Sequence, residues 1–455
     1  MNRLLARKIH LAQSAVLLGS LALSAHAQGA RADSTIRLTL AEAIQIATQQ
    51  NVAVAGAQAR VEAARARVVQ RRADLLPDVT GTLREGGSTI NSATFPIDFP
   101  STPGQPALFD PRGQILGPVN VFDARAKVSE TLFDPAARAR IQTARTGVAA
   151  ASADVASAAD QAATQAANAY LAVLRADAVY SARVQDSTLA ADLVAIAQEQ
   201  LRAGTGVALD VTRARAQLAN ARAQLIGARN DRDRTRVELA RVLGLSDMNI
   251  QVRDSLGALG SASVVSEDAA LALAAQNRKD VQALNLQAQA ARQAADAIRT
   301  ERLPSVGVFA DEGQSQRNGR SYLPTYDWGI QLSVPIFDGN RREGRVNEQL
   351  AQAHELDVRA RDLRDQVTAD VRTATLNLRS SSEQVDAARE RLTLAEQELT
   401  QARERFQAGV AGNADVITAS LSLNAARTQL VDALAGYQTA RVSLARAEGN
   451  IGTLQ

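Results

Sequence analysis

Hydrophobic and polar residues alternate along one short stretch, Asp327–Gly339, in a chain that otherwise repeats its apolar residues at helical spacing. Every second residue from Trp328 to Ile336 is apolar, and Gly, Gln, Ser and Pro lie between them. This period of two predicts a β-strand with one apolar face. A related run, Phe122–Pro135, also contains Phe-Asp near its end, so the pattern predicts two copies of one structural unit.

The first copy starts with a stretch that is rich in Ala, Gln and Arg and contains no proline, which predicts a helix over 38–72. Thr39 and Glu42 at its start have the spacing of a capping box. Leu76-Pro77 follows, and the residue before a proline disfavours helical backbone, so we expect the helix to stop there. Strands are predicted over 78–87 and 122–132, separated by a long loop rich in Ser, Gly and Pro, and together they form a hairpin over 78–132.

A long helical hairpin is predicted after these strands. Asp134-Pro135 supplies an N-cap and a first-turn proline, and helical sequence then continues to about Ala203. Gly204-Thr205-Gly206 breaks the helix, and a returning helix runs to about 243 with Gly244 as its C-cap. The sequence predicts four divisions: a leader over 1–27, a first repeat over 28–245, a linker over 246–263 and a second repeat over 264–455. The helical hairpin of the first repeat is predicted at 134–243. The second repeat is predicted to contain a helix over 266–301, a β-hairpin over 305–337 with strands 305–313 and 326–337, and a helical hairpin over 338–448.

The arms of the second helical hairpin carry Leu and Ala at alternating spacings of three and four residues, which is the pattern of a coiled-coil seam. The seam comprises Val385, Ala388, Leu392, Ala395, Leu399, Ala402 and Phe406 on one arm, and Val416, Ala419, Leu423, Ala426, Leu430, Ala433, Tyr437, Ala440 and Leu444 on the other. The first copy repeats the spacing in Val211, Ala214, Leu218, Ala221, Leu225 and Ala228. Such a narrow apolar stripe suits a curved wall with water on both sides better than a solid core.

Composition supports the division of the chain into β-hairpins and long helices. All 11 prolines lie within 77–135 or 304–337, where most aromatic residues also lie. Residues 1–27 have a basic start, a short apolar run and Ala25-His26-Ala27, which predicts a cleaved secretory signal peptide. Its three basic residues account for the formal net charge of +3, so the charge gives no support for nucleic-acid binding.

The chain has no cysteine, and His354 is the only histidine outside the leader. Disulfides, thiol nucleophiles, Cys-based zinc sites and His clusters are therefore excluded. A Ser-His-Asp arrangement would need His354, which lies in charged helical sequence and is better interpreted as a surface residue. We therefore predict no enzyme, no cofactor and no metal site.

The order of helix, Leu-Pro, β-hairpin, Phe-Asp, long helix, Gly-containing break and returning helix occurs twice, and over 38–448 it resembles the TolC-like outer membrane factor (outer membrane efflux protein) family. The resemblance implies a mainly α fold with a small β part, in which long coiled-coil helices form an α-barrel. Four strands per chain would contribute to a shared trimeric transmembrane β-barrel.

The function implied by this resemblance is the outer-membrane exit channel of a tripartite efflux or type I secretion system. Its partners would be two further copies of the chain, outer-membrane lipid, a periplasmic membrane-fusion adaptor protein and, through the adaptor, an inner-membrane transporter of RND, ABC or MFS type. Drugs, metals and proteins would use the same duct, so the cargo stays open.

Physical reasoning favours the same arrangement for the strands. Membrane barrels begin at about eight strands, and an open sheet edge in lipid leaves backbone groups unpaired, so several chains must share one barrel. The aromatic residues suit belts at the membrane interface. The alternative is a small soluble β-subdomain, where aromatics also gather. The residues assigned to the belts are Phe122, Phe133, Phe309, Tyr322, Tyr326, Trp328 and Phe337.

The two helix breaks resemble the periplasmic tips of this family, which implies adaptor docking there and a narrow pore. The docking residues would be Gly204, Thr205, Gly206, Gly409, Val410 and Gly412, and the constriction would be formed by Asp210, Asp415 and Thr418. Three Asp415 side chains around a symmetry axis would favour cations. Alternatively, each Asp only stabilises the start of the returning helix through the helix dipole.

Three tip positions depart from the family pattern of an aromatic hydroxyl, an Arg and a second acid. Phe406, Ala411 and Thr418 stand there, so we predict a weakly latched tip. The rival interpretation of the whole chain is an exported structural coiled-coil or filament protein, which the Ala-, Gln- and Arg-rich heptads favour. That interpretation leaves the two proline- and aromatic-rich hairpins without an explanation.

Overall fold

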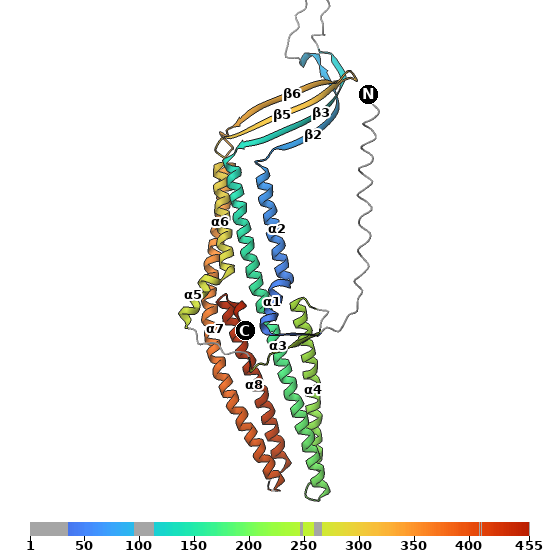
Figure 1. Cartoon of the computed structure of the whole chain (residues 1–455), viewed down its shortest axis with the longest axis vertical. Coiled ribbons are helices and arrows are strands. Elements are labelled where there is room, and N and C mark those ends of the chain that lie inside the picture. The colour runs from blue at the N-terminus through green and yellow to red at the C-terminus, as the bar shows by residue number, and fades with distance from the viewer. Residues whose placement is uncertain are drawn as a thin grey trace, which may run out of the picture. The chain divides into compact units, whose positions relative to one another are not determined.

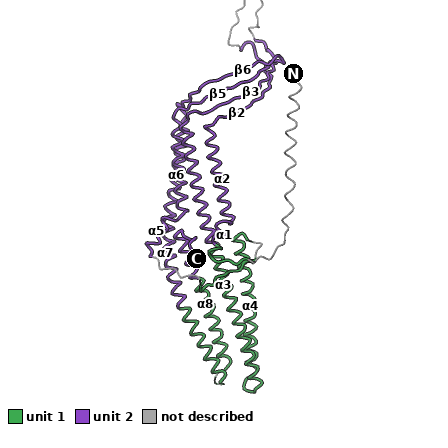
Figure 2. The backbone as a smooth tube through the Cα atoms, viewed as in Figure 1, with its two compact units in different colours: residues 1–43, 166–259, 387–435 green, residues 44–165, 260–386, 436–455 purple. Residues whose placement is uncertain are grey.

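The computed structural model describes residues 35–94, 113–245, 249–258, 266–408, 410 and 412–454. The signal peptide predicted over 1–27 lies outside these residues. The chain divides into two compact units, coloured separately in Figure 2. Unit 1 comprises residues 1–43, 166–259 and 387–435, and unit 2 comprises residues 44–165, 260–386 and 436–455.

Unit 2 contains a four-stranded antiparallel sheet, seen as the long arrows of Figure 1. Its strands are β2 (Asp78–Asn91), β3 (Ile115–Phe133), β5 (Ser305–Arg317) and β6 (Leu323–Ser333), in the order β2-β3-β5-β6. Both predicted hairpins are confirmed. The additional pairing of β3 with β5, for example Ser129 opposite Phe309, joins the two repeats into one sheet.

The strands differ from the prediction at their ends. The prediction that the last strand reaches Phe337 was wrong, because β6 ends at Ser333. Ser333 pairs with Ser305, which is the first residue of β5, so β6 has no partner strand beyond this point. Beyond it Pro335 has no N–H to donate and restricts the residue before it. Gly339 and Asn340 have φ of 66° and 65°, a left-handed backbone that helices do not contain. The following helix therefore starts at Arg341 rather than at residue 338.

Each helix predicted before a hairpin is two helices. The first is α1 (Leu40–Gln50) and α2 (Val52–Ala73), and the second is α5 (Glu267–Asn277) and α6 (Lys279–Thr300). Asn51 breaks the first with an extended backbone, and its side chain accepts a hydrogen bond from the Ala53 N–H at 2.9 Å. Arg278, also extended, breaks the second. The prediction of a single helix was wrong in both cases, because one residue with extended backbone interrupts the helical hydrogen bonds.

The capping box is confirmed at the start of α1. The Thr39 N–H donates to the Glu42 carboxylate at 2.8 Å, and the Glu42 N–H donates to the Thr39 hydroxyl at 3.3 Å. These hydrogen bonds satisfy donors that the first helical turn leaves free. The Thr39 backbone N–H, and after it the Thr39 hydroxyl, lower the pKa of Glu42, because each favours the charged form of its carboxylate.

The long helices are α3 (Pro135–Arg202), α4 (Ala208–Leu243), α7 (Arg341–Gln407) and α8 (Asn413–Ala447), and two 3-10 turns lie at Ser92–Thr94 and Ile451–Thr453. The Asp134 carboxylate caps α3 by accepting from the Ala136 N–H at 2.8 Å. Gly244 caps α4 with φ of 72°, as predicted. In the part of the chain that the structure describes, no helix is both long and apolar enough to cross a membrane.

The predicted seam is confirmed as the core of unit 1. Val416, Ala419 and Leu423 of α8 are buried with Ala395, Leu399 and other seam residues of α7. The whole cluster is Leu189, Leu193, Ala395, Leu399, Phe406, Val416, Ala419, Leu423 and Ala426. In unit 2 a smaller cluster joins α5, α7 and α8 through residues such as Ala270, Val371 and Leu444.

A short parallel strand pair in unit 1 was not predicted. β1 (Thr35–Leu38) pairs with β4 (Asn249–Val252), so the interval 246–263, which was predicted only as a linker, contains a strand. The fully buried Tyr170 of α3 holds this pair. Its hydroxyl lies 2.9 Å from the Leu38 carbonyl oxygen and 2.8 Å from the Asp254 carboxylate, which also accepts from the Leu40 N–H.

Candidate functional site

The tip between α3 and α4 is a tight turn built on two glycines. Gly204 has φ of 74°, which a residue with a Cβ rarely adopts. The N–H groups of Thr205 and Gly206 both donate to the Gln200 carbonyl at 3.0 Å, which closes the end of α3. A Cβ on Gly206 would lie only 3.0 Å from Gln200 Cβ. The predicted docking residues Gly204, Thr205 and Gly206 therefore form one compact surface turn.

The tip between α7 and α8 ends in exposed Val410. The Val410 N–H donates to the Arg405 carbonyl, and α8 begins three residues later. Asp415 lies exposed in the first turn of α8, and its N–H donates to the Gly412 carbonyl at 3.2 Å. Gly409 and Ala411 lie outside the described residues. The Thr418 hydroxyl donates to the Ala414 carbonyl of its own helix.

The two tips are linked by Asn413, which the sequence did not single out. Its side-chain amide donates to the Asp210 backbone carbonyl at 3.1 Å, and the residue is fully buried. Asp210 itself is half-buried, with its carboxylate 3.9 Å from the Arg213 guanidinium. The tips are therefore held together through Asn413, and the two Asp side chains have different environments.

Phe406, one of the three tip positions that depart from the pattern implied by the resemblance, belongs to the buried cluster of unit 1. It packs with the seam and has no hydroxyl to offer a gate. This position contributes apolar burial rather than a polar latch.

A buried polar cluster lies deeper in unit 1 and was also missed. Asp186 of α3 has a carboxylate only 1% exposed, with the Arg183 guanidinium at 2.9 Å and the Arg427 guanidinium of α8 at 3.3 Å. Arg183 also donates to the Thr428 hydroxyl. Burial raises the pKa of Asp186, and the two guanidinium groups oppose this rise. Helical periodicity gave no signal for it, because Arg427 and Thr428 come from a helix more than two hundred residues away in sequence.

The sheet of unit 2 has one apolar and one polar face. Directly opposed residues of antiparallel strands share a face, so the register assigns Ala310 and Trp328 to the same side, as it does Val308 and Ile330. Trp328 and Ile330 are both 74% exposed in the chain. The apolar residues of this face are Val79, Leu83, Phe122, Ala124, Ala126, Val128, Phe133, Val306, Val308, Ala310, Tyr326, Trp328, Ile330 and Leu332. The register also assigns polar residues to it: Glu130 opposite Val308, Glu85 opposite Phe122, Glu312 opposite Tyr326, and Gln314 opposite Ala124.

The polar face carries an ion-pair network across three strands. Arg125 of β3 contacts Asp123, Asp311 of β5 and the Thr325 hydroxyl of β6. Lys127 lies one pair further along the same face, with its ammonium 6.0 Å from the centroid of the Phe309 ring. One side of the sheet is therefore suited to water and the other to an apolar environment.

The predicted belt aromatics divide between these faces. Tyr326, Trp328 and Phe133 belong to the apolar face, and Phe122 does too, with its ring edge-on to Tyr322 at 6.1 Å. Phe309 shares the polar face with Gly329, and its ring covers that glycine. Phe337 lies beyond the end of β6 and is 83% exposed.

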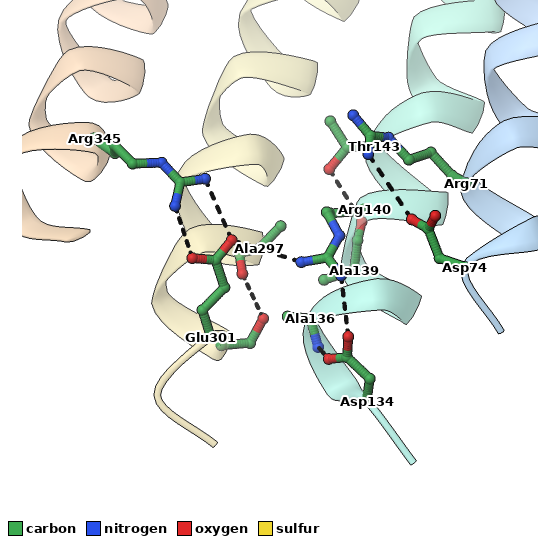
Figure 3. Close-up of polar contacts among 11 residues, drawn as sticks. Arg71, Asp74, Asp134, Ala136, Ala139, Arg140, Thr143, Ala297, Glu301 and Arg345 are labelled. Carbon is green, nitrogen blue, oxygen red and sulfur yellow. Dashed lines mark hydrogen bonds and ion pairs between the residues drawn. The ribbon is translucent and has the colours of Figure 1, made fainter. Parts of the chain in front are cut away.

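Ion pairs connect the helices at the base of the sheet (Figure 3). Arg140 of α3 contacts the Asp134 carboxylate at 3.0 Å and the Glu301 carboxylate at 3.6 Å. Arg345 of α7 donates to Glu301 at 2.8 Å. Asp134, Glu301 and Arg345 lie at the points where strands pass into helices or helices end, so these contacts fix the helices at the strand–helix junctions.

The fold is that of outer-membrane channel proteins. The outer membrane protein VceC from Vibrio cholerae superposes with a TM-score of 0.72 and 21% sequence identity, covering 90% of this chain and 96% of VceC. The predicted fold class, mainly α with a small β part, is confirmed.

Sequence comparison gives the family. The family described as outer membrane efflux protein matches residues 43–245 and 270–450, and the chain belongs to this family. The alkaline protease secretion protein AprF of Pseudomonas aeruginosa is 28% identical over 286 residues, which cover 59% of this chain and 57% of AprF. The protein CyaE of Bordetella pertussis is 25% identical over 289 residues, or 62% of this chain and 60% of CyaE. The matches thus span about three-fifths of these relatives.

Proposed function

We propose that this chain forms an outer-membrane exit channel through which an efflux or type I secretion system releases its cargo. The observation that carries the proposal is the four-stranded sheet with one exposed apolar face and one charged face, continued by helical hairpins with only a narrow apolar seam. The apolar face meets lipid, and the face with Arg125 and Asp311 lines water. Membership of the outer membrane efflux protein family supports this proposal.

The number of chains in the proposed channel follows from the edge strands of the sheet. β2 and β6 are the outer strands of the sheet, and each has a single partner strand within the described chain. Unpaired backbone groups are costly in lipid, so the edge of one chain pairs with the next chain. Three chains would supply about twelve strands, which is enough for a closed barrel. The trimeric barrel implied by the resemblance is thus our proposal for the assembly.

Fractionation of cell membranes tests the channel directly. We expect a heat-resistant trimer in the outer-membrane fraction, with the leader 1–27 removed from the mature N-terminus. A soluble filament without membrane association would contradict the channel and support the exported coiled-coil protein instead.

The tips are the proposed docking surface for a periplasmic adaptor, which would connect the channel to an inner-membrane transporter. Exposed Val410 and the compact Gly204–Gly206 turn offer a small, protruding surface. The relative AprF is an alkaline protease secretion protein, which favours a transporter that exports protein as the partner of this channel.

Adding bulk at one tip tests docking. A Cβ on Gly412 would meet nothing within 4 Å, so Gly412→Trp changes the surface without a local clash. We expect efflux or secretion to fall at least tenfold while trimers form normally. Gly227→Trp in α4, also in open space, is the control and should leave export unchanged. Normal export by the Gly412 variant would contradict docking at this tip.

Asp415 is proposed to line the constriction, because its side chain is exposed in the first turn of α8. Asp210 is half-buried beside Arg213, so its charge is partly balanced there. Thr418 lies on the same helix one turn further on. Single-channel recording of Asp415→Ala should show reduced cation selectivity. Unchanged selectivity would contradict a role in the constriction and leave Asp415 only the role of stabilising the start of α8.

A further inference from the structure

An arginine-lined cavity of about 450 Å³, open to solvent beside the exposed Arg67 and Arg71, lies in unit 2 among α2, α3, α6 and α7. Its lining includes four guanidinium groups, those of Arg67, Arg71, Arg140 and Arg345. Glu301 is the only acid among its described lining residues. The cavity adjoins the strand–helix junctions of Figure 3, where Arg71, Arg140, Glu301 and Arg345 are drawn.

The acids near this cavity satisfy only part of its positive charge. Glu301 is shared between Arg345 and Arg140, and Arg140 also contacts Asp134. The nearest acid to Arg71 is Asp74, at the long distance of 3.8 Å. Within the described residues Arg67 has no ion pair or hydrogen bond. The α2 side of the cavity is therefore left with positive charge that no neighbouring acid neutralises closely.

Local sequence explains why these charges gather. Arg67 and Arg71 are one turn apart on α2, and Gln70 lies on the same side, so two like charges face one cavity. Like charges at this spacing repel each other. Opposite them Ala144, Ala294 and Ala297 have side chains too small to fill the space. An unfilled space lined by repelling guanidinium groups is an arrangement that a bound anion would stabilise.

The guanidinium group selects the class of anion. Its planar fork of N–H donors matches two oxygens of a phosphate or carboxylate at once. Because three helices contribute these forks around one space, the ligand should present oxygens in several directions, as a tetrahedral phosphate does. The volume is also within the range of small-molecule sites, which exceeds what a single ion needs.

We propose that the arginine-lined cavity is a binding site for a phosphate group, with Arg67 and Arg71 as its main ligands and Arg140 as a third, oriented by Asp134 and Glu301. The phosphate can belong to a lipid headgroup or to a free phosphate in solution. The proposal goes beyond the channel function and does not depend on it, because the site lies within one unit of one chain.

Phosphate binding by the purified full-length protein tests the site. Calorimetry in a non-ionic detergent would use inorganic phosphate, and thermal unfolding in nanodiscs would compare phosphatidylcholine alone with added phosphatidylglycerol. The cavity variant is Arg67→Gln/Arg71→Gln. Its control is Arg60→Gln/Arg72→Gln, which removes two exposed charges from the same helix outside the cavity.

We expect the cavity variant to bind at least tenfold more weakly and the control to stay within twofold of the wild type. Loss of inorganic phosphate binding identifies a free phosphate as a ligand. If the cavity variant loses only its stabilisation by phosphatidylglycerol, the ligand is the phosphate of a lipid headgroup. The proposal is overturned if neither ligand distinguishes the cavity variant from the wild type, or if the control loses binding equally.

A gain of binding separates this site from a folding defect. Glu301→Gln frees Arg140 and Arg345 from their shared acid and raises the positive charge of the cavity. We expect Glu301→Gln to bind inorganic phosphate or phosphatidylglycerol severalfold more tightly, which partial unfolding would not produce. Unchanged or weaker binding by this variant would also overturn the proposal.

Discussion

Removing the side chain of Asp186 should destabilise unit 1. Its buried carboxylate faces the partly buried guanidinium groups of Arg183 and Arg427. Removing one partner of a buried ion pair leaves the other charge without compensation, at a cost of roughly 3–5 kcal/mol. We therefore expect Asp186→Ala to lower the free energy of unfolding by about 3 kcal/mol, measured by circular dichroism during thermal or chemical unfolding.

The control for this change is Asp192→Ala, six residues further along α3 and exposed. Exposed substitutions of this kind usually change stability by less than about 0.5 kcal/mol. Equal effects of the two variants would show that the Asp186 network contributes little.

Glu448 should make the stability of the protein depend on pH. It is buried just after α8, its Oε1 has no hydrogen-bond partner within the described residues, and burial raises its pKa above the usual 4.5. The folded state therefore binds this proton more tightly than the unfolded state. Stability contributed by the protonated form is lost as pH rises from about 4.5 through the raised pKa.

Glu448→Gln, which cannot ionise, should remove this part of the pH dependence. We expect it to melt at a higher temperature than the wild type at pH 8, and the difference to shrink as the pH falls toward 4. Parallel melting curves for both proteins across this range would contradict the assignment.

Among the elements, β6 has a glycine that its neighbouring strand requires. A Cβ on Gly329 would lie 3.0 Å from Cζ of the Phe309 ring of β5. Gly329→Ala should therefore push the ring away and destabilise the sheet by about 1 kcal/mol, measured as a lower melting temperature. Gly86→Ala in β2, where a Cβ meets nothing within 4 Å, is the control.

Element ends show how far sequence rules extend. Thr39 and Glu42 cap α1, Asp134 caps α3 and Gly244 ends α4, all as predicted, because each depends on contacts within a few residues. The breaks at Asn51 and Arg278 were missed, since neither a glycine nor a proline marks them. The end of β6 at Ser333 was also missed, because it depends on where β5, its partner strand, begins.

At the scale of the whole molecule, the two faces of the sheet should respond differently to charge. Ile330 lies on the exposed apolar face, and its neighbour Gln331 lies on the polar face. A lipid-facing Arg costs roughly 2–4 kcal/mol near the bilayer centre. We expect Ile330→Arg to reduce the outer-membrane trimer strongly and Gln331→Arg to leave it in place, measured by unheated gel electrophoresis of membrane fractions. Equal trimer yields would contradict the proposed membrane face.

Local sequence was enough to predict the repeated order of helices and strands and the coiled-coil seam, because periodicity and caps depend on neighbouring residues. The repeated order in turn carried the resemblance to the outer membrane efflux protein family. The pairing of β1 with β4, the contacts of Asp186 and Asn413, and the arginine-lined cavity became visible only in the folded chain. Each of these features joins residues that are far apart in the chain. Their contacts and burial depend on which elements pack together, and the local sequence pattern does not encode that.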